Sequence, residues 1–225
     1  MHSTKGVHNF SISKAHKAQL YLSQKIVAED RLFQEIKRIA GVDVAYTDDV
    51  AIGSVAVLDY ESLELLEQQT VTRQAKFPYI PTLLSFREIP PAIACIKKLR
   101  LQPEVFLVDG QGVAHPYGCG FASHLGLAIG KSTIGVAKSR LVGEPQTVAG
   151  REFLIQKGRI IGEVVTTKKG VKPVYVSVGH LTSLGTAVEI VKHCVRNSRI
   201  PEPILQAHKI ASEEKRKVVA KRKTL

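Results

Sequence analysis

Two apolar runs of this chain each contain or end in a carboxylate, and this feature limits the possible folds more than any other. Asp43 lies within Ile39-Ala-Gly-Val-Asp-Val-Ala45, and Asp109 follows Val105-Phe-Leu-Val108. Continuous apolar runs of this kind form buried strands, which carry both acids toward a core. Because an unpaired buried carboxylate costs several kcal/mol or becomes protonated, such acids are usually paired or bound to a metal ion.

A third acid, Glu88 in Phe86-Arg-Glu88, lies between them in the sequence. Taken singly, Asp109 before Gly110 is typical of a strand-ending turn, and Glu88 of a solvated helix residue. Three carboxylates from non-adjacent elements suit Mg²⁺, which prefers octahedral oxygen coordination, and two such ions can clamp an in-line displacement at phosphorus. We therefore predict that Asp43, Glu88 and Asp109 bind Mg²⁺, with Mn²⁺ as a substitute.

The charge of the chain indicates the class of partner. The 225 residues include 32 Lys and Arg against 20 Asp and Glu, a formal net charge of +12. A basic surface attracts polyanions, although a solvated face that serves solubility gives the same count. The length and a hydrophobic content of 44% predict one catalytic domain over residues 1–225, without a membrane partner. The three widely spaced cysteines argue against a disulfide framework and for a reducing compartment, so we expect a cytoplasmic protein. We also expect a monomer.

Residue spacing predicts a mixed α/β fold with helices on both faces of the sheet. The pattern indicates one or two helices over residues 13–37 that pack over the sheet, and then an antiparallel meander. The later elements include a βαβ unit, and the basic segment from about residue 215 is either a frayed helix end or a phosphate contact. The predicted strands are 39–47, 51–60, 64–76, 105–108, a hairpin within 152–166, 133–137 and 173–178, and the predicted later helices are 83–100, 123–129, 182–195 and 204–217.

Three further features are candidates for the site. The segment Pro78-Tyr-Ile-Pro81 is stiff, and it is either a packed hinge or a wedge whose aromatic side chain occupies the space of an extruded base. Lys138 follows an apolar strand and is either solvated or a cation that faces a phosphate. His115 lies close after Asp109 in the sequence, and we place it beside the acids.

Together these features resemble the endonuclease V family of deoxyinosine-directed repair nucleases. The resemblance extends from about Gly41 to His208 and includes several motifs in the family's order. These are Gly41-Val-Asp43, Pro78-Tyr-Ile-Pro81 followed by Phe86-Arg-Glu88, Val108-Asp-Gly-Gln-Gly112 with Ala114-His-Pro116, Ala122-Ser-His-Leu-Gly126, Ile134-Gly-Val-Ala-Lys-Ser-Arg140 and Ile200-Pro-Glu-Pro203.

The resemblance implies a fold, a reaction and a substrate. The expected fold is a ribonuclease H-like mixed sheet, and the expected enzyme is a deoxyribonuclease V, a DNA repair phosphodiester hydrolase. It would cut the second phosphodiester bond 3′ to deoxyinosine and leave 3′-hydroxyl and 5′-phosphate ends. The partner would be DNA that contains deoxyinosine. The alternatives are an endoribonuclease for inosine-containing RNA and, less favoured, a non-catalytic nucleic-acid-binding module.

The resemblance also assigns roles to individual residues. Besides the three acids, it implies catalytic roles for Lys138, His208 and His115, and a wedge at Tyr79. The substrate-binding residues that it implies are Pro78, Tyr79, Ile80, Pro81, Thr82, Leu84, Gly110, Gly120 and Phe121. This chain departs from the family at Thr82, where relatives commonly have glycine, at Tyr117 and Gly118, which replace a basic stretch, and at Leu205, which replaces a frequent arginine.

Overall fold

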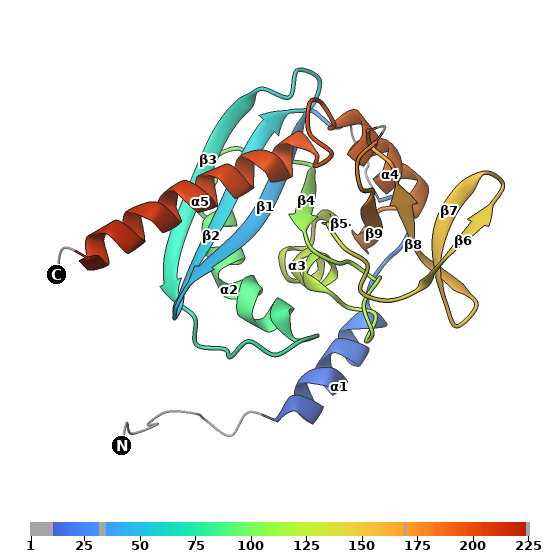
Figure 1. Cartoon of the computed structure of the whole chain (residues 1–225), viewed down its shortest axis with the longest axis horizontal. Helices are drawn as coiled ribbons and strands as arrows, with labels where there is room; N and C mark the ends of the chain where they lie inside the picture. The colour runs from blue at the N-terminus through green and yellow to red at the C-terminus, as the bar shows by residue number, and fades with distance from the viewer. Residues whose placement is uncertain (1–10, 32–34, 169, 224–225) are drawn as a thin grey trace.

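The computed structural model describes residues 11–31, 35–168 and 170–223. Within these residues the strands are β1 Arg38–Thr47, β2 Val50–Asp59, β3 Leu65–Gln74, β4 Val105–Asp109, β5 Ser132–Ala137, β6 Glu144–Val148, β7 Arg151–Gln156, β8 Arg159–Val165 and β9 Val174–His180. The helices there are α1 Ile12–Ser23, α2 Leu84–Ile96, α3 Phe121–Ile129, α4 Leu184–His193 and α5 Glu202–Lys223. The strands form one sheet in the order β3-β2-β1-β4-β5-β9-β8-β7-β6 (Figure 1).

The strand order confirms the predicted meander and βαβ unit. Strands β1, β2 and β3 pair antiparallel, whereas β1, β4 and β5 pair parallel, with α3 connecting β4 to β5. The final pair between β1 and β4 is Val42 opposite Val108. Asp43 and Asp109 each follow directly, so the register places both acids side by side on neighbouring strands, where the pairing of β1 with β4 ends.

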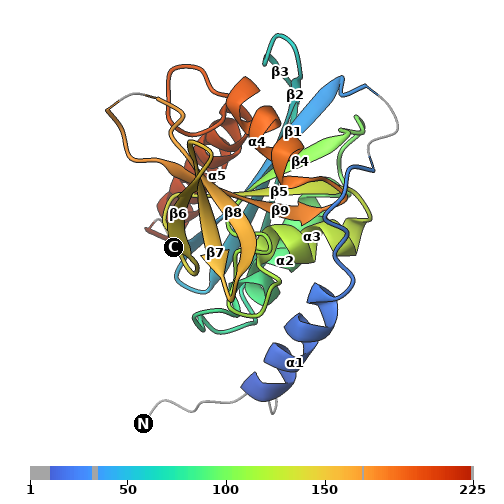
Figure 2. The same ribbon diagram turned by 90° about the vertical axis from the view of Figure 1, so that its right-hand side faces the viewer.

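Helices cover both faces of the sheet, as predicted (Figure 2). On one face, α4 and α5 pack on a core that includes Ile39, Leu107 and Ile134. On the other face, α2 and α3 pack on a core that includes Val42 and Phe106. This two-faced packing buries β1 and β4 from both sides, which is why their sequences are continuously apolar.

Two glycines allow helices to approach the sheet closely. A Cβ added at Gly41 in β1 would lie 1.9 Å from the carbonyl oxygen of Pro203, at the start of α5. A Cβ added at Gly53 in β2 would lie 2.6 Å from the carbonyl oxygen of Pro91 in α2. Because backbone atoms block both positions, the absence of a side chain there fixes how near the two helices lie to β1 and β2.

We expect Gly41→Ala to destabilise the protein by about 2 kcal/mol or more, because its methyl group would force α5 away from β1. Gly185→Ala is the matched control, since a Cβ there would approach the Ser183 hydroxyl oxygen only to 3.9 Å, an ordinary van der Waals contact. In helix α4 that change should be neutral or stabilise by about 0.5–1 kcal/mol. Urea unfolding measures both, and equal midpoints for the two variants would contradict the close α5 packing.

Several predicted elements differ from the structure. Helix α1 ends at Ser23, and the residues from 24 to 31 are not helical; Leu32 and Phe33 of the predicted pattern lie outside the described residues. Helix α1 also contacts α3 and does not pack over the sheet. Strand β6 was not predicted, because all five of its residues are exposed and carry no apolar alternation.

The C-terminal segment is a regular continuation of α5, which runs to Lys223, so the predicted frayed end is wrong. Arg222 holds this end of the helix against the β1–β2 turn, where it pairs with Asp48 at 3.1 Å and with Asp49 at 3.0 Å. In the described ranges of the chain, every helix is too short or too polar to span a bilayer.

Candidate active site

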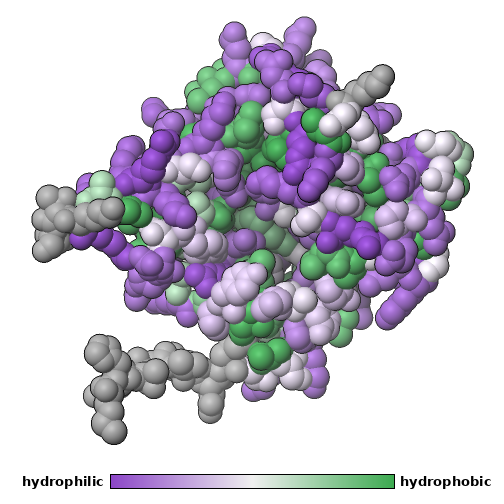
Figure 3. All heavy atoms as spheres, viewed as in Figure 1, coloured by the Kyte–Doolittle hydropathy of each residue, from purple (hydrophilic) through white to green (hydrophobic). Residues whose placement is uncertain are grey.

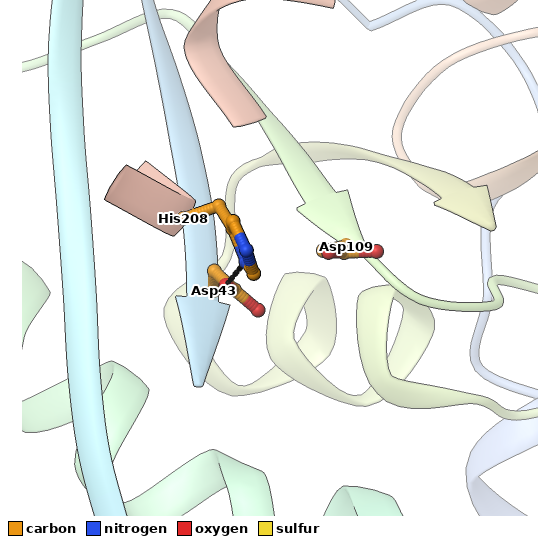
Figure 4. Close-up of side chains that lie close together, drawn as sticks. All are labelled: Asp43, Asp109 and His208. Atoms are coloured by element: carbon orange, nitrogen blue, oxygen red, sulfur yellow. Dashed lines mark hydrogen bonds and ion pairs between the residues drawn. The ribbon is translucent and has the colours of Figure 1, made fainter. Parts of the chain in front are cut away.

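Asp43 and His208 face one another across the junction of β1 and α5 (Figure 4). The Nδ1 atom of His208 lies 2.8 Å from Oδ2 of Asp43, and the amide of Val44 donates a hydrogen bond of 2.8 Å to Oδ1. Asp43 is buried, whereas half of the His208 side chain is exposed. The two hydrogen bonds fix the orientation of the carboxylate and leave lone pairs of both its oxygens available.

Ser54 of β2 joins the strands to α5 at this point. Its fully buried hydroxyl lies 3.1 Å from the carbonyl oxygen of Asp43 and 2.8 Å from that of Ala207. Ala207 directly precedes His208, so the backbone of β1 and the backbone of α5 share one hydroxyl. Together with the contact at Gly41, this places His208 over Asp43 in the middle of β1.

Asp109 lies on the end of β4 beside this pair (Figure 4). Asp43, Asp109 and His208 each offer a ligand atom, and these atoms all lie within 4.8 Å of one another. Two carboxylates and one imidazole at such spacing form a donor set for a divalent metal ion. Two of the three predicted metal-binding acids, Asp43 and Asp109, therefore lie together, and the third member of this closest set is His208.

Glu88 on α2 does not belong to this closest set, although it shares a cavity wall with Asp109. The pKa of Glu88 is raised to about 8, first by burial and then by the charges of Asp43 and Asp109, while Arg87 opposes the rise. Like charges destabilise each other's ionised form only when they are near. The three predicted acids therefore lie close enough for their charges to influence one another's ionisation.

Lys138 comes from the end of β5 and forms an ion pair with Asp109. Burial and the charge of Asp43 raise the pKa of Asp109, and Lys138 and His208 act against this rise. The ammonium group thus lies at the acid cluster, as predicted, and also faces the adjacent cavity. A cation in this position can stabilise negative charge on a phosphate without leaving the site.

A cavity of about 390 Å³ opens beside Asp109, Glu88 and Lys138. It contains seven of the nine predicted substrate-binding residues, whereas Pro78 and Ile80 do not line it. Tyr79 lines its edge with a side chain that is 68% exposed. The seven are Tyr79, Pro81, Thr82, Leu84, Gly110, Gly120 and Phe121.

Glycines bring the loop after β4 close to the start of α3 and form the floor of this cavity. The Gly120 amide donates a hydrogen bond of 2.9 Å to the carbonyl oxygen of Gly112, and a Cβ at residue 120 would lie 2.4 Å from the carbonyl oxygen of Gln111. The Gln111 side chain in turn donates to the carbonyl oxygen of Ser139 at 3.0 Å. This loop therefore joins the cavity floor to the Lys138 segment.

His115 lines the same cavity and is 6% exposed. Its Nδ1 atom accepts a hydrogen bond of 3.3 Å from the amide of Tyr117, and it also bonds with the backbone of Thr82. Burial lowers the pKa of His115 to about 4, so the ring is neutral at neutral pH. The His115 ring therefore forms part of the cavity wall, where it contacts Thr82.

Sequence reasoning missed several residues that shape the site. Ser54 has no local signal, because a serine in a strand is typical of a surface residue. Arg87 stacks on the ring of Tyr46 with 4.3 Å between its guanidinium carbon and the ring centroid, next to Glu88 in the chain. His16 and Gln19 of α1 contact Thr82, and the helical spacing of residues 13–37 gave no indication of it.

Comparisons with known proteins find relatives that match most of this chain. The family model described as Endonuclease V matches residues 20–209. The Endonuclease V of Thermofilum pendens is 43% identical over 91% of this chain and 89% of its own length. The crystal structure of Endonuclease V from Streptomyces avermitilis has a TM-score of 0.84 at 34% identity and covers 93% of this chain and 95% of its own. Endonuclease V of Ciona intestinalis, in complex with a 24mer DNA containing an inosine followed by a ribo-adenosine, has a TM-score of 0.82 at 32% identity, with 92% and 98% covered.

Proposed function

Because the chain belongs to the endonuclease V family, we propose that it is a metal-dependent repair endonuclease that cuts DNA at the second phosphodiester bond 3′ to deoxyinosine. The observation that carries this proposal is the register of β1 and β4, whose parallel pairing ends at Val42 and Val108 and so places Asp43 and Asp109 side by side near a cavity of about 390 Å³. A cavity of this size falls in the range of ligand pockets, which is roughly 300–1,000 Å³. The acids would act on the backbone and the cavity would select the base.

The three carboxylates Asp43, Glu88 and Asp109 fit Mg²⁺, with Mn²⁺ as a substitute. Carboxylate oxygens are the ligands that both ions prefer. Burial and then the charges of Asp43 and Asp109 raise the pKa of Glu88, and a bound cation would relieve the repulsion between these charges. We assign Asp43, Asp109 and Glu88 as the residues that hold the metal, with His208 next to Asp43. A bound divalent ion would supply an activated water and neutralise charge on the phosphate.

The remaining residues would position the strand and the base. Lys138 would place its ammonium group against the phosphate, since it lies at both the acids and the cavity. The backbone at Gly110 and Gly120 would approach the edge of an extruded hypoxanthine, because both residues line the cavity. A weakly paired base costs less to extrude, which favours the lesion over normal bases. His115 would complete the wall that holds Thr82.

The nature of the sugar is a second question for the same site. The ligand of the Ciona intestinalis relative contains inosine in DNA and a ribonucleotide directly after it. This observation favours testing RNA as the second candidate substrate. The surface seen in Figure 3 is mostly hydrophilic over the face of α5 and β1–β3, which suits the polar, wet interfaces formed with nucleic acids.

A strand-cutting assay tests the proposal. The protein is incubated with labelled DNA and RNA strands that carry one inosine, in Mg²⁺ or in excess chelator. We expect Mg²⁺-dependent cleavage of the DNA strand at the second phosphodiester bond on the 3′ side of the inosine. Cleavage of RNA alone would identify the protein as an endoribonuclease. Binding of either strand without any product would identify it as a non-catalytic nucleic-acid-binding module.

We expect Tyr79→Ala to slow the cutting of inosine in duplex DNA by roughly tenfold or more and to affect single strands much less. In a duplex the exposed ring would fill the space that the extruded base leaves, whereas a single strand has less stacking to replace. Single-turnover rates on matched duplex and single-stranded substrates measure the difference. Tyr21→Ala is the control, because it removes another exposed aromatic ring that does not line the cavity, and it should leave both rates unchanged. Equal losses on both substrates would return Tyr79 to the role of a packed hinge.

A further inference from the structure

Helix α1 holds two loops of the candidate site together, although it lies apart from the sheet (Figure 1). The loop before α2 contains Thr82, and the loop before α3 contains Cys119. The side-chain amide of Gln19 donates hydrogen bonds to the carbonyl oxygens of both, at 2.8 Å to Thr82 and 3.2 Å to Cys119. One amide group on α1 therefore bridges two walls of the cavity.

A second contact from α1 strengthens the bridge. Nε2 of His16 lies 3.1 Å from the hydroxyl of Thr82, and the His16 ring stacks on Tyr117 with 3.9 Å between centroids. Tyr117 belongs to the same loop as Cys119, and its amide holds His115. His16 and Gln19 of α1 thus each contact Thr82 and the loop of residues 115–120 at the same time.

Thr82 needs such support because of its backbone conformation. Its φ angle is +71°, in the left-handed region that favours glycine and is costly for a β-branched residue. Thr82 lines the cavity next to Pro81 and Leu84. A strained residue keeps its conformation only where its surroundings determine it, and here those surroundings are α1 and His115.

The burial of Gln19 argues against a role in packing alone. The residue is 0% exposed, and within the described part of the chain its Oε1 atom has no hydrogen-bond partner. A buried unpaired acceptor is unfavourable, and an apolar side chain of the same length would fill the space without that cost. The two hydrogen bonds that the amide donates to Thr82 and Cys119 therefore explain why a polar side chain occupies this buried position.

We propose that Gln19, with His16, is a positioning residue of the base pocket that fixes the separation of the Thr82 and Cys119 loops and so sets which base is accepted. The identity of the ligand rests on the proposed function, whereas the contacts of Gln19 with the two loops are a property of this fold. Gln19 touches neither the acids nor the cavity, so it acts through Thr82. The fixed walls would separate hypoxanthine from guanine, which carries one additional amino group.

The test compares Gln19→Met with Gln24→Met. Methionine keeps the unbranched shape of glutamine and lacks the amide donors, so the helix should still pack. Gln24 is exposed at the end of the same helix, and no hydrogen bond of its side chain is seen in the described residues, which makes it the matched control. The measurement is the ratio of kcat/KM for an inosine strand to that for the same strand with guanosine. Loss of two neutral hydrogen bonds should lower the ratio roughly tenfold in Gln19→Met and leave it unchanged in Gln24→Met.

Hydrogen–deuterium exchange supplies a readout that does not depend on activity. In Gln19→Met, the amides of residues 80–84 and 116–120 should exchange faster, with no change in β1 and β4. Unchanged exchange in both loops would contradict the proposal that Gln19 positions them. A lower melting temperature with an unchanged ratio of kcat/KM for inosine and guanosine strands would contradict it as well. Failure of the wild-type protein to cut inosine strands would instead refute the proposed function, and the exchange comparison would still decide whether α1 holds the loops.

Discussion

Asp43→Asn and Asp109→Asn are each expected to lower the rate of strand cutting by about a thousandfold or more, while binding to an inosine strand persists. Each change removes a charged oxygen ligand from the cluster and leaves the shape of the side chain nearly unchanged. A metal site supplies several kcal/mol of transition-state stabilisation, and each 1.4 kcal/mol corresponds to a factor of about ten in rate. The asparagine at position 43 can still accept the bond from Val44, so the fold should remain intact.

Single-turnover cleavage and fluorescence anisotropy, measured on the same strand, separate chemistry from binding for these variants. Glu61→Gln is the control, because it removes an acid from the exposed β2–β3 turn far along the sheet from the cluster. It should keep the full rate. Turnover within tenfold of wild type for either aspartate variant would remove that residue from the metal site.

Glu88→Gln is expected to stabilise the metal-free protein, by about 1 to 3 kcal/mol at neutral pH, although it should abolish most of the activity. The pKa of Glu88 is raised to about 8 in the folded protein, mainly by burial and then by Asp43 and Asp109. At neutral pH the unfolded chain releases the proton of Glu88 whereas the folded protein retains it, so folding requires uptake of a proton at a cost in free energy that a neutral amide does not have. Mg²⁺ should stabilise the wild-type protein by mass action. It should therefore reduce or reverse the difference in unfolding free energy between Glu88→Gln and wild type, because the variant has lost a ligand.

The dependence of this difference on pH follows from the direction of the shift. The folded-state pKa lies above the value of about 4.5 expected when unfolded, so the contribution of Glu88 to stability is greatest below that value and is lost as the pH rises toward 8. The stability gap between Glu88→Gln and wild type should widen from pH 5 to pH 8 and then level off. Urea unfolding in chelator measures it.

Glu213→Gln is the control for these titrations, since Glu213 is exposed on α5 and no ion pair of this residue is seen in the described chain. Its effect should stay within about 0.5 kcal/mol at every pH. A Glu88→Gln variant that is less stable than wild type without metal at pH 8 would show that Glu88 is not held against the other acids.

The sequence predicted the centre of the fold well because two of its signals are physically strict. Continuous apolar runs at Ile39 and Val105 require strands buried on both faces, and those strands lie in parallel pairing at the middle of the sheet. An acid within or directly after such a strand is usually paired or bound to a metal ion. The same reasoning brought Lys138 to the cluster, because it follows the neighbouring parallel strand.

Other parts depend on contacts that leave no local pattern. The amphipathic spacing of α1 shows an apolar face but does not show that it lies against α3 and two loops, so the expected position over the sheet was wrong. The exposed β6 forms by pairing with β7 and has no buried face to reveal it. The end of α5 consists mainly of lysine and arginine, yet it remains helical where Arg222 meets Asp48 and Asp49.

The central claim is that Asp43, Glu88 and Asp109 form one centre for divalent ions, and anomalous diffraction from crystals soaked in Mn²⁺ tests it most directly. The account predicts a strong peak between Asp43 and Asp109, at a coordination distance of about 2.1 Å from carboxylate oxygens, that is lost in crystals of Asp43→Asn. Well-ordered crystals in which Mn²⁺ binds elsewhere, or in which the peak survives in Asp43→Asn, would contradict it.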